Sequence, residues 1–135
     1  MAILGTGIDI VEVARLEEVL LRRGERFLER VFTEAERTYC ANRPRPAIHY
    51  AGRFAAKEAV LKAIRTGWVA GIGWRDIEVT LGPGGEPSIH LSGGALARAR
   101  EMGVETIHVS ISHTEGHAVA SAVAEGKTGN VMRET

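Results

Sequence analysis

Residues 47–64, with the sequence AIHYAGRFAAKEAVLKAI, constrain the fold more than any other segment of this chain. Most of them are alanine, leucine, lysine, glutamate or arginine, which favour helices, and Gly52 is the only poor helix former. Because a helix advances about 100° per residue, the apolar side chains from Phe54 to Ile64 spread around nearly the whole circumference. The sequence therefore predicts a long helix that other elements cover on most sides.

Two charged residues, Glu58 and Lys62, interrupt this apolar surface. On a helical wheel that starts at Phe54, they fall at about 40° and about 80°, so they share one narrow strip. Arg53 and Lys57 are predicted to form a separate basic edge on another side. An i, i+4 pair of Glu and Lys on a solvated face contributes only about 0.3–0.5 kcal/mol, and the strip alone does not distinguish such a pair from a functional site.

Asp9 favours the functional interpretation. Residues 3–11, ILGTGIDIV, alternate with the period of a strand, and Asp9 lies mid-strand on the face opposite to its isoleucine neighbours. A carboxylate in an apolar strand loses hydration unless a cation or hydrogen-bond donors compensate. If this strand faces the long helix, Asp9 and Glu58 form a carboxylate pair that suits Mg²⁺, which takes one or two protein carboxylates plus water and phosphate oxygens. With Lys62 they form a candidate phosphate-handling site.

The other segments predict short helices and antiparallel strands. Thr33 and Glu36 have the spacing of a capping box that opens a helix. Helices are expected over 13–23, 25–32, 34–41 and 93–102, and strands that form two hairpins are expected over 76–81, 87–91, 106–112 and 118–124. A length of 135 residues fits one domain. We therefore expect a compact α+β domain over residues 1–135, with a mostly antiparallel sheet packed against the long central helix.

Charge and composition exclude several classes of protein. Lys plus Arg and Asp plus Glu each total 17, which argues against non-specific attraction to nucleic acid or anionic lipid. No apolar run approaches the roughly 20 residues that cross a bilayer, and the N-terminal segment lacks the basic region of an export signal. Cys40, the single cysteine, excludes an internal disulfide and fits a reducing compartment. We expect a cytoplasmic protein that binds neither nucleic acid nor membrane.

Three further motifs favour structural interpretations. His113 and His117 have an H-x₃-H spacing, but they flank a predicted strand turn and lack the further ligands of a zinc site. Ser112 and His113 are neighbours on a strand, so their side chains point to opposite faces and do not form a nucleophile–base pair. The segment GPGGE, residues 82–86, lies between strands and lacks the Lys-Ser/Thr of a P-loop, which indicates a turn.

Arginines and glutamates are interspersed along residues 15–30. The arginines are Arg15, Arg22, Arg23, Arg26 and Arg30, and the glutamates are Glu17, Glu18, Glu25 and Glu29. Such mixed charge is typical of a solvated helix face. A docking surface for an acidic partner is the alternative, and the pattern alone favours the solvated face.

Three segments together resemble the 4′-phosphopantetheinyl transferases of the holo-acyl-carrier-protein synthase type. They are GTGIDIVEV near the N-terminus, GRFAAKEAVLKAIRTG at mid-chain and HVSISHT near the end, and the resemblance spans roughly residues 3–125. It implies an enzyme that transfers 4′-phosphopantetheine from coenzyme A to a serine of apo acyl carrier protein. The products would be adenosine 3′,5′-bisphosphate and the holo carrier protein, which supports fatty acid biosynthesis.

The resemblance also implies roles for individual residues. By motif match, Asp9 and Glu58 bind Mg²⁺, and Lys62 lies near the diphosphate as a catalytic residue. Glu58, directly or through a water bound to the metal, is the expected acceptor of the serine proton. The implied coenzyme A contacts are Arg53 and His113 for phosphates, and Gly85 and Pro87 for the adenine.

The carrier protein is acidic in this family and docks on a basic first helix. This implies that Arg15, Arg22, Arg26 and Phe27 bind the partner, although the glutamates among these arginines depart from a purely basic surface. The family also implies a homotrimer with active sites between subunits. Two alternatives stay open: a non-catalytic module that binds coenzyme A or a nucleotide, and a transferase that acts on carrier domains of polyketide or peptide synthases.

Overall fold

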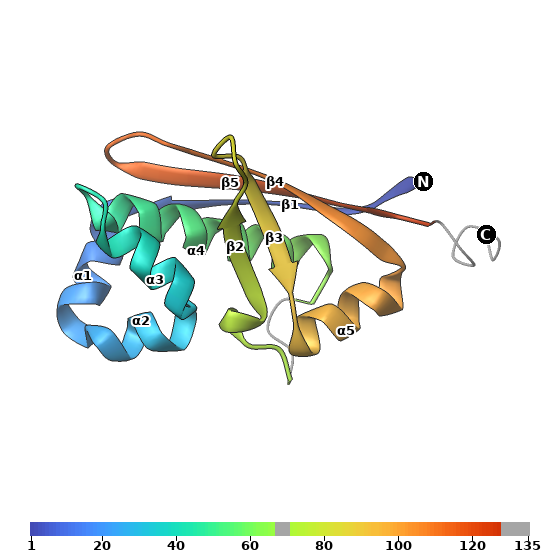
Figure 1. Cartoon of the computed structure of the whole chain (residues 1–135), viewed down its shortest axis with the longest axis horizontal. Helices are drawn as coiled ribbons and strands as arrows, with labels where there is room; N and C mark the ends of the chain where they lie inside the picture. Colours follow the sequence, from blue (N-terminus) through green and yellow to red (C-terminus); the bar gives the residue numbers. More distant parts are fainter. Residues whose placement is uncertain (67–70, 128–135) are drawn as a thin grey trace.

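A computed structural model describes residues 1–66 and 71–127, and its centre is a long helix packed on an antiparallel sheet. The helix, α4 (Pro46–Ala63), lies along β1 (Ala2–Glu12), β4 (Val104–His113) and β5 (His117–Gly126) (Figure 1). The strand order is β1-β5-β4, so the last strand of the chain is the central one, and both pairings are antiparallel. The predicted α+β class is confirmed.

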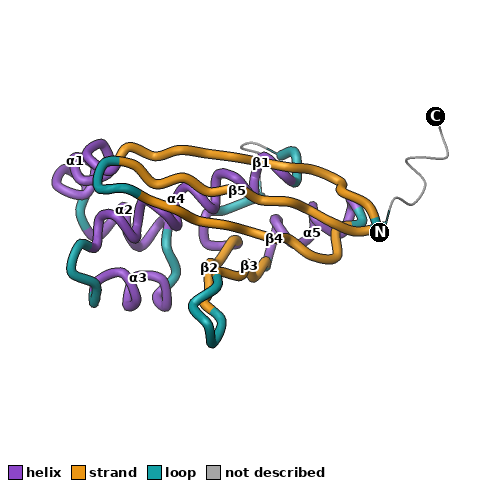
Figure 2. The backbone as a smooth tube through the Cα atoms, turned by 90° about the horizontal axis from the view of Figure 1, so that it is seen from above, coloured by secondary structure: helices purple, strands orange, loops and turns teal. Residues whose placement is uncertain are grey.

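The remaining elements surround α4 on the side away from this sheet, as Figures 1 and 2 show. Helices α1 (Val13–Arg23), α2 (Glu25–Val31) and α3 (Glu34–Ala41) gather at one end of α4. Strands β2 (Ile77–Leu81) and β3 (Pro87–Leu91) form a separate two-stranded sheet, preceded by a short 3₁₀ helix (Trp74–Asp76) and followed by α5 (Gly93–Met102). None of the helices within residues 1–66 and 71–127 is long and apolar enough to span a membrane.

Small side chains let α4 lie close to the sheet. Alternate residues of β5 are buried alanines, and three of them, Ala120, Ala122 and Ala124, belong to one apolar cluster with buried alanines of α4. The buried alanines of β5 are Ala118, Ala120, Ala122 and Ala124, and those of α4 in the cluster are Ala55, Ala56, Ala59 and Ala63. Alanine on both elements lets the two backbones lie close together.

The basic edge expected from Arg53 and Lys57 is wrong, because both side chains are buried. Lys57 Nζ lies 2.9 Å from Glu36 Oε1, and both side chains are 0% exposed. Lys57 also donates to the carbonyl of Ile77, and the backbone N–H of Val79 donates to Glu36 Oε2 at 2.7 Å. Burial lowers the pKa of Lys57, and Glu36 partly offsets this effect. The pair therefore ties α3 and β2 to α4.

Glu36 has a second role at the start of α3, where the predicted capping box is confirmed. The backbone N–H of Thr33 donates to Glu36 Oε1 at 2.8 Å, and the backbone N–H of Glu36 donates to Thr33 Oγ1 at 3.3 Å. Two otherwise unpaired helix N–H groups are thereby satisfied. The cap also holds the Glu36 carboxylate in place for Lys57.

Candidate functional site

Glycines near the N-terminus bring β1 into direct contact with α4. A Cβ atom at Gly5 would lie 1.9 Å from the carbonyl oxygen of Ala63, and one at Gly7 would lie 2.0 Å from that of Ala59. No side chain fits at either position without separating strand and helix. The two glycines of the GTGID segment therefore fix the distance between β1 and the face of α4 that carries Lys62.

Asp9, Glu58 and Lys62 lie together at this edge of the sheet, and we name them the β1-edge cluster. Lys62 Nζ lies 3.1 Å from Asp9 Oδ1 and donates to the carbonyl oxygen of Ile8 at 2.8 Å. Burial raises the pKa of Glu58, the nearby Asp9 raises it further, and Lys62 lowers it. The structure thus brings together the three residues that the sequence placed on one candidate site.

The donors of the β1-edge cluster suit a hard divalent cation better than zinc. Among the described residues, no group of three or more His, Cys, Asp and Glu side chains could hold a metal ion. Two carboxylates that repel each other gain from a cation between them, and Mg²⁺ completes its shell with water and phosphate oxygens. Asp9 and Glu58 therefore fit a magnesium ion that is shared with a phosphate-containing substrate.

A second group of side chains lies at the other edge of the sheet, and we name it the β4-edge cluster. It contains Tyr39, Arg43, His49, Arg53 and His113. The Arg53 guanidinium lies 4.2 Å from the centre of the Tyr39 ring, and its Nε has no hydrogen-bond partner although the residue is only 6% exposed. The ring of His49 lies 5.9 Å from that of Tyr39 and 5.9 Å from that of His113. The cluster is rich in cationic and aromatic groups.

The two clusters are separated by the width of the sheet. Asp9 belongs to β1 and His113 to β4, and β5 lies between these strands. On α4, the step from Arg53 to Glu58 turns about 140° around the helix axis. Arg53 and His113 therefore lie away from Asp9 and Glu58 of the same chain.

Gly85 and Pro87 lie in a third place, the turn between β2 and β3. The backbone N–H of Gly82 donates to Glu86 at 2.8 Å, and that of Gly85, whose φ is +83°, donates to Gly82 at 2.9 Å. This confirms the predicted turn, which projects from the rest of the molecule (Figure 2). Among residues 1–66 and 71–127, no hydrogen bond or ion pair joins Gly85 or Pro87 to either cluster.

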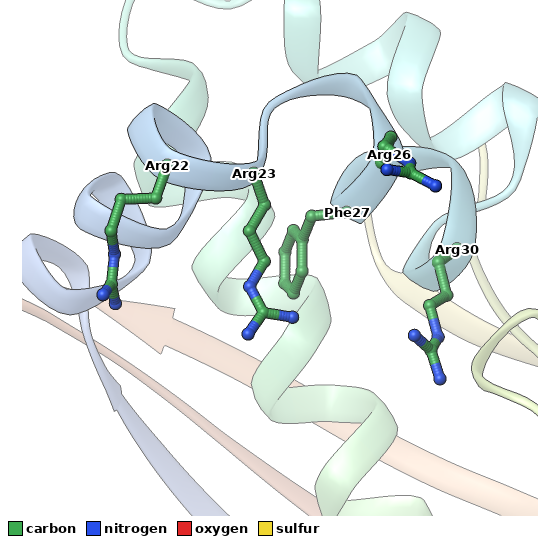
Figure 3. A pocket seen from close by; sticks show the side chains of 5 residues that line it. All are labelled: Arg22, Arg23, Arg26, Phe27 and Arg30. Atoms are coloured by element: carbon green, nitrogen blue, oxygen red, sulfur yellow. The ribbon is translucent and has the colours of Figure 1, made fainter.

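Arginines surround a pocket between α1 and α2, as Figure 3 shows. The pocket has a volume of about 460 Å³ and is lined by Arg22, Arg23, Arg26, Phe27 and Arg30; we name it the arginine pocket. Its lining contains no carboxylate, although glutamates are interspersed with these arginines in the sequence. Within the described part of the chain, none of these arginines forms an ion pair. The fold thus separates charges that are interspersed in the sequence.

A second hollow shares Phe27 with the arginine pocket and is bordered by Asp9 of the β1-edge cluster. It has a volume of about 270 Å³, and Asp9, Arg15, Phe27 and Phe54 are among the residues that line it. Phe27 borders both hollows, and its ring lies 6.3 Å from that of Phe54 on α4. A partner bound over the arginines could therefore reach Asp9 along a partly apolar path.

Sequence reasoning missed two parts of this arrangement. The Glu36–Lys57 pair was not expected, although a lysine among alanines on a covered helix could have signalled a buried partner. Tyr39 and His49 were also missed, because they become neighbours of His113 only when α3, α4 and β4 pack together. The i, i+4 spacing of His49 and Arg53 on α4 was the one available signal.

Comparisons with known proteins agree with the motifs. A family model described as the 4′-phosphopantetheinyl transferase superfamily matches residues 5–122. The chain is 49% identical to the holo-[acyl-carrier-protein] synthase of Koribacter versatilis over 123 residues, which cover 91% of this chain and 98% of that protein. It is also similar to two crystal structures of holo-[acyl-carrier-protein] synthases.

The structure from Neisseria meningitidis has a TM-score of 0.84 and 32% identity, and the match covers 92% of this chain and 99% of that one. The structure from Helicobacter pylori, in complex with coenzyme A, has a TM-score of 0.79 and 33% identity, with 89% of this chain and 99% of that one covered. The chain therefore belongs to the 4′-phosphopantetheinyl transferase superfamily and, within it, to the holo-[acyl-carrier-protein] synthases.

Proposed function

We propose that this chain transfers 4′-phosphopantetheine from coenzyme A to a serine of apo acyl carrier protein. The observation that carries the proposal is that Asp9, Glu58 and Lys62 meet at one edge of the sheet in a chain of this family. A module that only binds coenzyme A would not need two carboxylates that repel each other in a half-buried site. The expected roles in fatty acid biosynthesis and in the cytoplasm stay predictions.

The three residues of the β1-edge cluster have metal-binding, charge-stabilising and proton-accepting roles in this reaction. The serine oxygen attacks the phosphorus that bears the pantetheine arm, the bond to the bridging oxygen breaks, and adenosine 3′,5′-bisphosphate leaves. Asp9 and Glu58 would hold Mg²⁺, which would supply positive charge to the diphosphate oxygens. Lys62 stabilises the negative charge that develops on the leaving phosphate. Glu58 would accept the serine proton, directly or through a water held by the metal.

The two clusters support an active site that forms between subunits. Coenzyme A carries a diphosphate and, on its ribose, a 3′-phosphate. If the β1-edge cluster takes the diphosphate, Arg53 and His113 of the same chain lie across the sheet, roughly 10 Å away by strand spacing alone. A neighbouring subunit could supply these two residues to the 3′-phosphate. Gly85 and Pro87 stay candidates for the adenine contact.

The outer face of β1 supports the homotrimer that such sharing requires. Ile3, Ile8 and Ile10 are 60%, 64% and 65% exposed. A row of isoleucines open to water is unfavourable in a lone subunit and is the kind of surface that an oligomer interface covers. The face of the sheet away from α4 would then pack against the same face of the neighbouring subunits, with the active sites at the edges of the sheet.

The arginine pocket and the adjoining hollow support carrier docking at α1 and α2. Arg22, Arg26 and Phe27 line the first, and Arg15 and Phe27 line the second, which reaches Asp9. Basic side chains without carboxylate partners attract an acidic protein, and the attraction weakens with salt. These four residues are the proposed carrier contacts, and the serine would approach Asp9 through the second hollow.

A mass measurement tests the function. The chain is mixed with coenzyme A, Mg²⁺ and apo carrier proteins of fatty acid, polyketide and peptide synthesis. We expect the fatty acid carrier to gain one phosphopantetheine, only when the metal is present. Glu58→Gln should abolish this gain and keep the fold, whereas Glu105→Gln, an exposed glutamate on β4, should not change it. The absence of any mass gain, with coenzyme A still bound, would favour the non-catalytic module.

A further inference from the structure

We propose that His49 is a proton-coupled part of the phosphate site at the β4 edge: its imidazole takes up a proton when a phosphate monoester binds, which makes coenzyme A binding depend on pH. This inference rests on the proposed function, because it takes the 3′-phosphate of coenzyme A as the anion. It concerns a residue that the sequence motifs did not implicate, one helical turn before Arg53 on α4.

The rings around His49 fix its position within the β4-edge cluster. Tyr39 of α3 and His113 of β4 both lie 5.9 Å from His49 in edge-on arrangements, with interplanar angles of 78° and 68°. His49 therefore sits between the two rings and is only half-buried. An anion that contacts His113 would lie beside the His49 imidazole as well.

The charges that face His49 come from every neighbouring element. Arg53 lies on α4, and Arg43, which follows α3, places its guanidinium 4.4 Å from the centre of the Tyr39 ring and donates to the Tyr39 hydroxyl at 2.8 Å. Within residues 1–66 and 71–127, no ion pair involves Arg43, His49, Arg53 or His113. The cluster thus holds cationic groups that only water or a bound anion compensates.

The Arg53 side chain favours binding of an anion to this cluster. Its side chain is almost fully buried, yet its Nε has no hydrogen-bond partner. A buried, unpaired guanidinium nitrogen costs free energy unless an acceptor satisfies it. A phosphate monoester brings both the missing acceptor and the missing negative charge.

Proton uptake follows from this balance of charge. Burial, together with Arg53, His113 and Arg43, lowers the pKa of His49, so its imidazole is neutral near pH 7 in the free protein. A doubly charged phosphate cancels the repulsion from these cations and favours the imidazolium. Because the bound state then holds more protons than the free state, affinity must rise as the pH falls between the free and the bound pKa of His49.

Two measurements on the full chain test the coupling. The first compares dissociation constants for coenzyme A in wild type and His49→Phe, which keeps a ring between Tyr39 and His113. We expect the ratio of variant to wild-type constants to be about one near pH 8.5 and about three to ten near pH 6. The comparison at each pH cancels the titration of the phosphate itself. The matched control is His117→Gln. His117 is exposed and lies on the β4–β5 hairpin with His113, and the variant should have the wild-type dissociation constant at each pH.

The second measurement does not depend on the variant's folding. The ring-proton resonance of His49 is titrated by NMR in wild type, alone and with coenzyme A or dephospho-coenzyme A, and the pKa of His49 should rise only with coenzyme A. An unchanged His49 pKa, an equal rise with dephospho-coenzyme A, or a pH-independent affinity ratio would overturn this inference while the transferase stays active. Failure to bind coenzyme A at any pH would overturn the proposed function as well.

Discussion

Lys57 and Glu58 are neighbours in the chain but meet opposite surroundings. One helical step of about 100° places Lys57 in the interior against Glu36 and Glu58 at the half-buried β1 edge near Asp9. The charge of Lys57 is neutralised by Glu36, whereas the charge of Glu58 is destabilised by burial and by the nearby Asp9. A buried charge that is paired within the chain holds elements together, whereas a destabilised charge near the surface is available to a ligand.

The buried Glu36–Lys57 pair leads to a prediction about stability. Glu36→Gln removes the negative charge and leaves the Lys57 ammonium in the interior, so the free energy of unfolding should fall by about 3–5 kcal/mol. Urea denaturation measures the loss, and Glu34→Gln, an exposed position on the same helix, should change little. An equally small change in both variants would show that the pair does not matter for stability.

The same variant has an expected pH dependence. Burial already lowers the pKa of Lys57 below the usual lysine value of 10.5, and loss of Glu36 should lower it further. The folded state then binds fewer protons than the unfolded state, so stability rises with pH until the lysine of the unfolded chain also loses its proton. The deficit of Glu36→Gln relative to wild type should therefore shrink from neutral pH toward about pH 10.

Cys40 should behave as an inert core residue. It is buried, and burial raises the pKa of its thiol to about 12. Because the thiolate is the reactive form, a thiol reagent at about pH 8 should label the native chain slowly and the urea-unfolded chain at the rate of a free cysteine. Rapid labelling of the native chain would contradict this account of the interior around α3.

At the scale of elements, the contact between β1 and α4 determines whether the β1-edge cluster forms. Gly7 lies two residues before Asp9, and it leaves no room for a side chain against Ala59. The strand and the helix are joined there by backbone approach rather than by interlocking side chains. The position of Asp9 relative to Glu58 therefore depends on the lack of a Cβ atom at Gly7.

Gly7→Ala tests this dependence. The added methyl group should push β1 away from α4, lower the free energy of unfolding by about 3 kcal/mol, and reduce transfer activity more than stability alone explains. Gly116→Ala is the matched control, since a Cβ at Gly116 meets nothing within 4 Å. Activity of Gly7→Ala equal to that of the control, measured well below the unfolding temperature, would contradict the proposed role of this contact.

Local signals predicted most elements of this fold, and long-range packing decided the rest. The Thr33–Glu36 cap, the glycine that ends α1 and the alternation of β4 and β5 act within a few residues, so the sequence reveals them. The pairing of β1 with β5 joins distant segments, and the separation of the predicted β2–β3 hairpin from the main sheet depends on long-range packing; neither leaves a local pattern.

The candidate site divides in the same way. Asp9 and Glu58 were predicted because a carboxylate on an apolar strand and another on a covered helix are locally anomalous. Lys57 was misplaced because its partner, Glu36, lies on another helix. His49 was missed because its neighbours come from α3 and β4. Site residues could therefore be predicted from the sequence where a charged side chain stands out within its own apolar segment.

At the scale of the whole molecule, the two clusters lie at opposite edges of one sheet, with β5 between them. If the diphosphate of coenzyme A lies at Asp9, the β4-edge cluster of the same chain lies on the far side of β5. In a closed ring of three subunits, the β1 edge of each chain can meet the β4 edge of the next, which gives three equivalent sites. In the proposed trimer, the exposed isoleucines of β1 would supply the apolar surface for such contacts.

Mixed oligomers test this sharing directly. Glu58→Gln disables the β1 edge, and the double variant Arg53→Gln/His113→Gln disables the β4 edge, so each protein alone should be inactive at limiting coenzyme A. If the two are co-expressed in equal amounts and assemble at random, about one quarter of the sites combine an intact β1 edge with an intact β4 edge. Activity should recover to about one quarter of wild type, measured as carrier mass gain per subunit.

The matched control pairs two variants of the same edge, Asp9→Asn and Glu58→Gln. No combination of these chains restores an intact β1 edge, so the mixture should stay inactive however the subunits assemble. Recovery in the first mixture and none in the second requires that neighbouring chains supply the two edges of one site. Inactivity of both mixtures, with the two differently tagged chains co-purifying in one oligomer, would mean that both edges of each site come from the same chain.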